Sequence, residues 1–110
     1  MNILTISGSS QLKSSNALLL EKLSEIIPKH TFSHINNLGD FPLFTADKEH
    51  TPPEIILSFK KSIQAADMVV ICTPEYLHNI PAVLKNALEW TTLGGEFNEE
   101  KVFAMTYTPH

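Results

Sequence analysis

The stretch TPEYLHNIPAVLKNALEW, Thr73–Trp90, is the most distinctive run of this chain and decides its fold. It follows the apolar run MVVIC, Met68–Cys72, which is typical of a strand buried on both faces of a parallel sheet. The first half of the stretch is rich in loop-forming residues. The second half spaces its apolar residues as an amphipathic helix does, beginning at Pro81. The stretch therefore predicts a buried strand, a tight turn and a helix in immediate succession.

The rest of the chain repeats this alternation of apolar runs and amphipathic segments. Strands are predicted at Ile3–Ile6, His30–Asn36, Met68–Cys72 and Lys101–Tyr107. Helices are predicted between them, from Ser14 or Ser15 to Pro28, from Thr51 onwards, and from Pro81 to Gly94. Thr51-Pro52-Pro53-Glu54 has the spacing of a capping box, so we expect Thr51 to cap the second helix. This order predicts an α/β fold with three layers, in which a parallel sheet places ligand contacts at the carboxyl ends of its strands.

Composition restricts the classes of function. The chain has 110 residues, one domain or part of one, and 43% of them are hydrophobic. Its formal net charge is −4 with no basic stripe, so nucleic acid is not an expected partner. Cys72 is the single cysteine, so no internal disulfide can form. No apolar run is long enough to span a membrane and no secretory signal is recognisable, so a cytoplasmic domain is expected.

The loop after the first predicted strand, SGSSQLKSSN, runs from Ser7 to Asn16 and leads into a helix. Backbone N–H groups, hydroxyls and the helix dipole can cradle a phosphate at such a place. It lacks the Gly-Lys-Ser/Thr of a Walker loop, and Gly8 is its only glycine, so it is no dinucleotide fingerprint. The alternative interpretation is a plain polar loop that caps the helix.

The loop after the third predicted strand would lie beside the first loop if these two strands are neighbours. Pro74 and Pro81 stiffen it, and Tyr76 offers a flat ring on which an aromatic ligand could pack. The alternative is that Glu75 and Tyr76 are ordinary surface residues. For Trp90, a place in the core is the better interpretation.

Together the two loops resemble the NADPH-dependent FMN reductase family, which has a flavodoxin-like fold. The family's first signature, Gly-Ser followed by Ser-x-Asn, is matched by Gly8-Ser9 and Ser14-Ser15-Asn16. The family's second signature is a Pro-Glu-Tyr-Asn turn followed by a Pro-Gly-Val-Leu-Lys-Asn-Ala-Leu-Asp-Trp helix. In this chain the turn is matched by PEYL and the helix by PAVLKNALEW. The motif DFPLF, Asp40–Phe44, is also similar to the family's sequence after its second strand. The resemblance extends over the whole chain.

This resemblance implies an enzyme that passes hydride from NADPH or NADH, through bound FMN, to a quinone, azo compound, flavin or similar acceptor. It implies that the FMN phosphate contacts Ser9, Ser14 and Asn16, and that the ring lies against Pro74, Glu75 and Tyr76. Gln11, Ser15, Leu77 and Asn79 are further candidate cofactor-binding residues. Gln11 stands where many members have Arg, with Lys13 near enough to replace the charge, and Leu77 stands where Asn is usual. Because the cofactor carries the chemistry, no catalytic side chain is required. Members are usually homodimers or homotetramers.

Length is the largest departure from the family. Members usually continue through a further glycine-rich loop, a fifth strand and a last helix. We therefore expect residues 1–110 to form a single flavodoxin-like domain with four strands in the order 2-1-3-4 and the fifth strand missing. The domain is then either C-terminally truncated or completed by a partner subunit. The strand at Lys101–Tyr107 would then be an uncovered apolar edge.

Other readings of the sequence stay open beside the enzyme. A truncated or degenerate paralogue could serve as a non-catalytic flavin-binding or assembly module. A phosphoacceptor receiver is disfavoured, because the required acidic residues are absent after the first and third strands. Cys72 is expected to be a packing residue rather than a nucleophile. No metal site is expected, because the histidines show no ligand spacing: His30, His34, His50, His78 and His110.

Overall fold

The computed structural model describes residues 1–9, 15–27, 29–48, 50–73, 80–91 and 101–106. Its strands are β1 (Asn2–Ser7), β2 (Thr31–Ile35), β3 (Met68–Thr73) and β4 (Lys101–Thr106). Its α-helices are α1 (Ser15–Ile26), α2 (Glu54–Ala65) and α3 (Ala82–Glu89), and two short 3₁₀ turns, η1 (Leu38–Asp40) and η2 (Ala46–Lys48), follow β2. The predicted alternation of strands and helices is confirmed, and the two 3₁₀ turns were not predicted.

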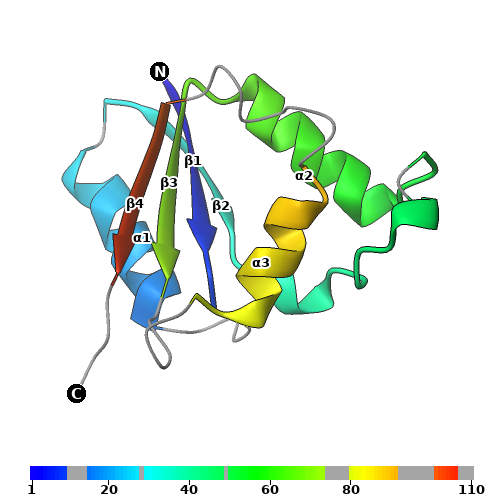
Figure 1. Cartoon of the computed structure of the whole chain (residues 1–110). Helices are drawn as coiled ribbons and strands as arrows, with labels where there is room; N and C mark the ends of the chain where they lie inside the picture. Colours follow the sequence, from blue (N-terminus) through cyan, green and yellow to red (C-terminus); the bar gives the residue numbers. More distant parts are fainter. Residues whose placement is uncertain (10–14, 28, 49, 74–79, 92–100, 107–110) are drawn as a thin grey trace.

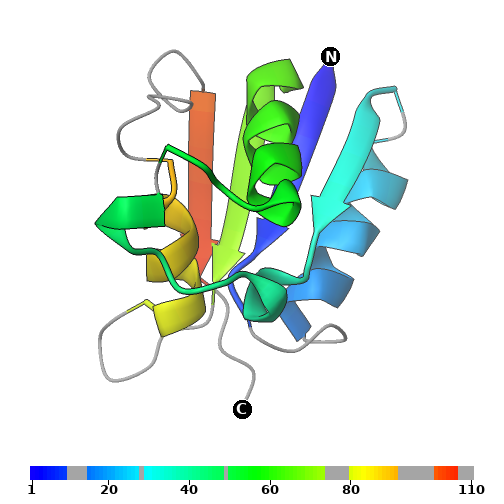
Figure 2. The ribbon, with the colours of Figure 1, turned by 90° about the vertical axis from the view of Figure 1, so that its right-hand side faces the viewer.

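The four strands form one parallel sheet in the order β2-β1-β3-β4, with β1 and β3 as neighbours at its centre (Figure 1). Helix α1 covers one face, and α2 and α3 cover the other (Figure 2). This is the three-layer α/β arrangement that the sequence predicts, and no fifth strand lies among the described residues. Placing β1 and β3 side by side brings the two candidate loops to the same edge of the sheet.

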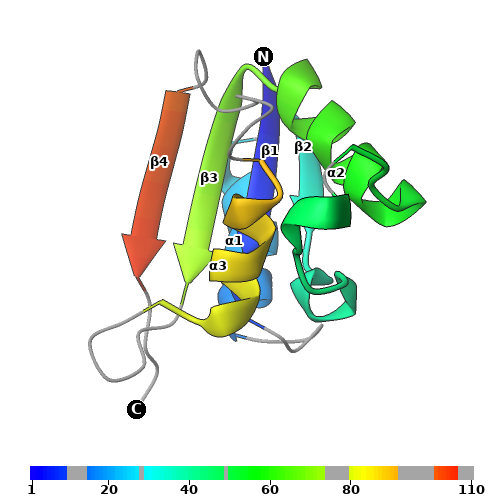
Figure 3. The same cartoon turned by 45° about the vertical axis from the view of Figure 1, so that its right-hand side comes forward.

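Successive side chains of the central strands β1 and β3 point to opposite faces of the sheet, and this alternation produces two apolar core clusters. Leu4, Ile6, Val69 and Ile71 face α2 and α3 and belong to the larger apolar cluster, which includes Trp90. Ile3, Val70 and Cys72 face α1 and form the smaller cluster with Leu20. Both sides of β1 and β3 are therefore buried, as their near-continuous apolar runs predict (Figure 3).

The predicted capping box at the start of α2 is wrong. Pro53, not Thr51, is the N-cap of this helix, and no side chain caps it. Pro53 has φ −62° and ψ 160°, and its carbonyl oxygen accepts hydrogen bonds from the N–H groups of Ile56 and Leu57. The N–H of Thr51 instead donates to the carbonyl of Lys48, which closes the turn after η2. Thr51 is thus part of the preceding turn.

Helix α3 ends at Glu89 with Trp90 as its C-cap, so the predicted end at Gly94 is wrong. Thr91 closes the last turn, because its N–H and its hydroxyl both donate to the carbonyl of Leu88, at 3.1 and 2.7 Å. The predicted burial of Trp90 is confirmed, since its side chain is only 2% exposed.

Candidate functional site

The carboxyl ends of β1 and β3 form the centre of the candidate site. Ser7 pairs with Cys72 in the sheet register, and the N–H of Gly8 donates to the carbonyl oxygen of Cys72 at 2.8 Å. The last bond of the ladder thus ties the first residue after β1 to β3. The predicted phosphate loop and the predicted ring-binding turn consequently leave the sheet next to one another.

Gly8 is required at this point because the backbone passes very close to β3. A Cβ atom at Gly8 would lie 2.8 Å from both Cβ and Oγ1 of Thr73, and 3.2 Å from Cδ2 of Leu84 on α3. Real Cβ atoms do not approach other atoms so closely, so any side chain would push the two segments apart. The glycine therefore lets the first loop rest directly on the base of the second.

Ser9 and Thr73 are the outermost described residues of the two loops. Both are buried, with exposed fractions of 6% and 7%, and both interact with other groups of the chain. Ser9 directly precedes the segment 10–14, and Thr73 directly precedes the segment 74–79.

Helix α1 contributes its N-terminus to the same edge. It runs antiparallel to β1, so its first residues, Ser15 and Asn16, lie at the carboxyl edge of the sheet (Figure 1). The N–H groups of a first helical turn have no partners within the helix, and the helix dipole is positive there. This end of α1 suits an anion such as a phosphate, as the sequence predicts for the loop before it.

The other predicted site residues are not placed. Gln11, Ser14, Pro74, Glu75, Tyr76, Leu77 and Asn79 lie outside the described residues, as do Lys13 and His78. Their contacts with a flavin stay predictions. The described neighbours fit an FMN phosphate, because a glycine without room for a Cβ and a helix N-terminus lie at one edge of the sheet.

Helix α3, which follows the predicted ring-binding turn, is anchored to the segment after β2. The carboxamide of Asn86 accepts a hydrogen bond from the N–H of Phe44 at 2.8 Å and donates one to the carbonyl of Pro42 at 2.9 Å. The indole N–H of Trp90 donates to the same carbonyl at 2.9 Å, and the Phe44 ring meets the Trp90 ring edge to face at 5.0 Å. We call these contacts the α3 anchor.

The role of Asn86 was missed by reasoning from the residues. Its position in the KNALEW run marked it only as part of a family signature. A buried-facing Asn among apolar helix residues was the signal that could have suggested a hydrogen-bonding role.

Cys72 is a packing residue, as predicted. Its side chain is fully buried in the smaller core cluster. Burial raises the pKa of the Cys72 thiol above its ordinary value, because a thiolate would lose its hydration there. The neutral thiol that results is a poor nucleophile.

The described part of the chain holds neither a membrane-spanning helix nor a metal-binding cluster. None of its helices is long and apolar enough to cross a membrane. Within the same ranges, no three His, Cys, Asp or Glu side chains gather as a metal site would require.

Comparison with known proteins gives a matching family and several similar chains. The family model for NADPH-dependent FMN reductases matches residues 1–110. An NADH:(hydroxy)cinnamate reductase subunit, CrdA, of Vibrio ruber is 33% identical over 110 residues, which are all of this chain and 54% of that protein. A 2-hydroxy-1,4-benzoquinone reductase of Burkholderia is 35% identical over 92 residues, which are 84% of this chain and 50% of that protein.

A solved structure shows the same fold over nearly the whole chain. FerB, a flavoenzyme NAD(P)H:(acceptor) oxidoreductase from Paracoccus denitrificans, superposes with a TM-score of 0.88 at 26% identity. The match covers 99% of this chain and 62% of FerB. The chain spans about half the length of the curated relatives it matches.

Proposed function

This chain belongs to the family of NADPH-dependent FMN reductases, and from that premise we propose that it carries the FMN-binding half of an NAD(P)H-dependent oxidoreductase. One observation carries the proposal most directly. Gly8 rests on Thr73, so the two segments that carry the family's signatures leave the sheet side by side at its carboxyl edge. In open α/β sheets, ligands bind at this edge, where the order of the strands reverses.

The phosphate of FMN is assigned to the first loop and the N-terminus of α1. Backbone N–H groups there, with the hydroxyls of the loop, would hold the phosphate and fix the position of the cofactor. The residues proposed for this role are Ser9, Gln11, Ser14, Ser15 and Asn16.

The flavin ring is assigned to the turn after β3. Pro74 restricts the backbone, and Tyr76 offers a ring against which the flavin would pack, while leaving its reactive face open to a second ligand. The residues proposed for this wall are Pro74, Glu75, Tyr76, Leu77 and Asn79. Bound FMN would supply the hydride-transfer chemistry, and the protein would orient it and limit access of water. The α3 anchor supports the wall by holding the helix that follows it.

The reaction proposed is oxidation of NADPH or NADH coupled to reduction of a small acceptor, such as a quinone, an azo compound or a flavin. The names of the relatives, a benzoquinone reductase and an NADH:(hydroxy)cinnamate reductase subunit, support this class. We further propose that residues 1–110 form one flavodoxin-like domain, that the active enzyme has additional chain and is a homodimer or homotetramer, and that it works in the cytoplasm. The length of the relatives supports the additional chain.

The test of the cofactor site is a comparison of FMN with riboflavin, which lacks the phosphate. Quenching of flavin fluorescence on titration with the protein gives both dissociation constants. FMN should bind at least about tenfold more tightly, since each hydrogen bond to a charged phosphate contributes roughly 1.5–3 kcal/mol. Equal affinities, or no binding of FMN, would refute the assignment of the phosphate to the first loop.

A second candidate function is a non-catalytic flavin-binding or assembly module, since the edge of the sheet that Gly8 and Thr73 form would serve a binding role equally well. The two candidates differ in turnover. The enzyme should oxidise NADH or NADPH when FMN and a quinone are present. A module should bind FMN without accelerating that oxidation.

A further inference from the structure

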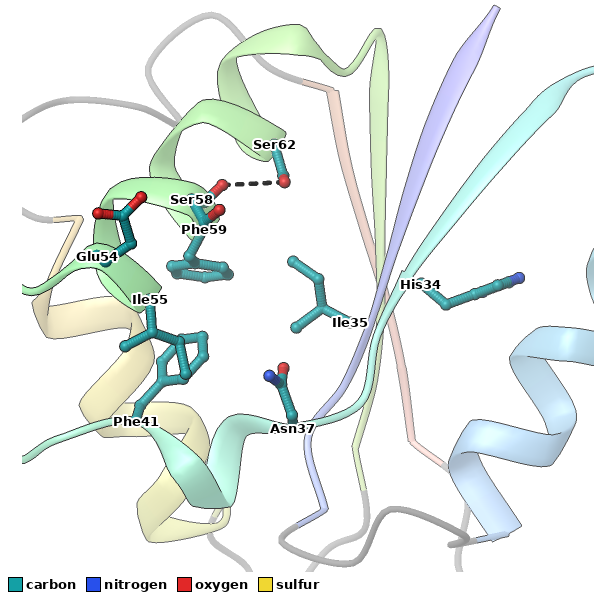
Figure 4. A pocket seen from close by; sticks show the side chains of 9 residues that line it. All are labelled: His34, Ile35, Asn37, Phe41, Glu54, Ile55, Ser58, Phe59 and Ser62. Carbon is teal, nitrogen blue, oxygen red and sulfur yellow. Dashed lines mark hydrogen bonds between the residues drawn. The ribbon is translucent and has the colours of Figure 1, made fainter.

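A pocket of about 550 Å³ lies between the edge strand β2 and helix α2 (Figure 4). It is separate from the candidate flavin site, because neither Gly8, Ser9 nor Thr73 lines it. Its volume falls within the range of small-molecule sites, which is roughly 300–1,000 Å³.

One side of the pocket is a rigid apolar wall. Phe41 and Phe59 meet edge to face, with their ring centroids 5.0 Å apart, and both belong to the larger core cluster. Ile55 on α2 and Ile35 on β2 extend this wall and point into the space (Figure 4). Such a surface accepts a flat ring or a similar apolar body.

Asn37 supplies a free polar group at the end of β2. It is the N-cap residue of η1, but its side chain makes no capping hydrogen bond. Within the described ranges the structure gives its carboxamide no hydrogen-bond partner, and Figure 4 shows this group pointing into the pocket. The carboxamide offers both a donor and an acceptor, so its natural partner is another amide edge.

The backbone of His34 offers a second donor and acceptor. The N–H of Thr31 donates to Met1 on the β1 side, and the carbonyl of Ser33 accepts from the Thr5 hydroxyl. Because successive residues of a strand direct their N–H and C=O groups to opposite sides, those of His34 face away from β1, towards the open edge. The His34 ring points away from the pocket (Figure 4) and hydrogen-bonds to Thr5, so the backbone is what His34 contributes.

Charge disfavours an anionic ligand. Glu54 lies at the rim of the pocket, and no Lys or Arg is among the described residues that line it. Glu54 also occupies the first turn of α2, where its carboxylate already supplies the negative charge that a helix N-terminus favours. A neutral ligand with N–H donors suits this rim better than a carboxylate does.

We propose that the pocket between β2 and α2 binds a small neutral aromatic carboxamide. The ring packs against Phe41, Phe59 and Ile55. The amide forms hydrogen bonds with the carboxamide of Asn37 and the outward backbone groups of His34, in the manner of a strand added to a sheet edge.

The test is a titration of the whole chain with benzamide, followed by the amide signals of ¹⁵N-labelled protein in NMR. We expect saturable shifts centred on His34, Asn37 and Ser58, with a dissociation constant on the order of 1 mM for a ligand of this size. Benzoate has the same ring and nearly the same shape, and it should bind at least about tenfold more weakly because it is charged and lacks N–H donors.

Two variants at neighbouring asparagines separate recognition from folding. Asn37→Leu should weaken benzamide binding roughly tenfold, because it removes the paired amide contact. Asn36→Leu is the matched control, because Asn36 is also half-buried but does not line the pocket, and it should leave the affinity unchanged.

Three results would overturn the proposal. The first is a failure of benzamide to saturate the shifts by about 10 mM, which is roughly ten times the expected dissociation constant. The second is an equal affinity of the protein for benzoate and for benzamide. The third is an equal effect of Asn37→Leu and Asn36→Leu on benzamide binding. Shifts centred on Gly8 and Ser9 would place the ligand in the flavin site and would also overturn it. The proposal does not depend on the flavin, so benzamide should bind with the same affinity whether or not FMN binds.

Discussion

Trp90 donates its indole N–H to the carbonyl oxygen of Pro42 at 2.9 Å, although 48 positions separate them in the sequence. This bond joins the end of α3 to the segment that leaves β2. Asn86 reinforces it from the preceding turn of the helix by pairing with both Pro42 and Phe44. The helix behind the predicted flavin wall is therefore held by the segment that follows β2, the strand at the opposite edge of the sheet from β4.

Replacing Asn86 with Leu should destabilise the fold. The substitution removes two hydrogen bonds and leaves the N–H of Phe44 without its acceptor, which costs about 1–3 kcal/mol when such a group is partly buried. Urea denaturation would measure the loss. Lys85→Ala, at an exposed position on the same helix, is the control and should change stability by less than about 0.5 kcal/mol. Equal stabilities of the two variants would contradict the importance of the anchor.

Replacing Gly8 with Ala should separate the two loops. The new Cβ would meet Cβ and Oγ1 of Thr73 at 2.8 Å, so either β3 or the first loop must move, at a cost of about 1–3 kcal/mol. FMN affinity should fall as well, because both loops are proposed to contact the cofactor. Gly39→Ala, at an exposed position in η1, is the control for the loss of a glycine. A Gly8→Ala protein with unchanged stability and FMN affinity would show that the close approach is unimportant.

Replacing Asn16 with Asp should affect stability and cofactor binding in opposite directions. A carboxylate in the first turn of α1 interacts favourably with the helix dipole, so stability should stay the same or rise by up to about 1 kcal/mol. The same charge should repel the FMN phosphate and weaken binding by roughly tenfold or more. Ser24→Asp adds the same charge farther along α1 and should leave FMN affinity unchanged. If both variants bind FMN as the parent does, the phosphate lies elsewhere.

Burial of Cys72 predicts a loss of stability at alkaline pH. The pKa of the buried thiol is raised above 9.0, the ordinary value, so the native state keeps its proton at pH values where the unfolded state loses it. The contribution of this thiol to the free energy of unfolding is therefore fully present below pH 9.0 and declines as the pH rises beyond it. Urea denaturation between neutral and alkaline pH should show a steeper decline for the parent than for Cys72→Ala. Parallel curves would contradict this role of the thiol.

The sequence predicted the framework well because local patterns control it. The apolar runs of β1 and β3 mark strands buried on both faces, and the alternation with helices leads to a parallel sheet. The helix spacing of Leu20 and Leu23 likewise identified α1. The predicted loops emerge at one edge of the sheet, although most of their residues lie outside the described ranges.

Two kinds of feature were not predictable in this way: the exact ends of the helices, and contacts between residues that are far apart in the sequence. Thr51-Pro52-Pro53-Glu54 has the spacing of a capping box, yet Thr51 belongs to the turn after η2, and the helix begins only after Pro53. The end of α3 was placed too late because Gly94 is a strong local stop signal, whereas Thr91 closes the helix earlier. The α3 anchor and the pocket beside β2 arise from residues that are far apart in the sequence.

The α3 anchor also has a consequence for how the chain acquires its structure during synthesis. Pro42 leaves the ribosome before α2 and β3, and its carbonyl can meet Asn86 and Trp90 only after both of those elements have emerged. Closing a loop of this length costs conformational entropy, and the hydrogen bonds of the α3 anchor can offset that cost only after α3 arrives. The segment after β2 should therefore be among the last parts of the nascent chain to become protected from proteases, although it is among the first to be made.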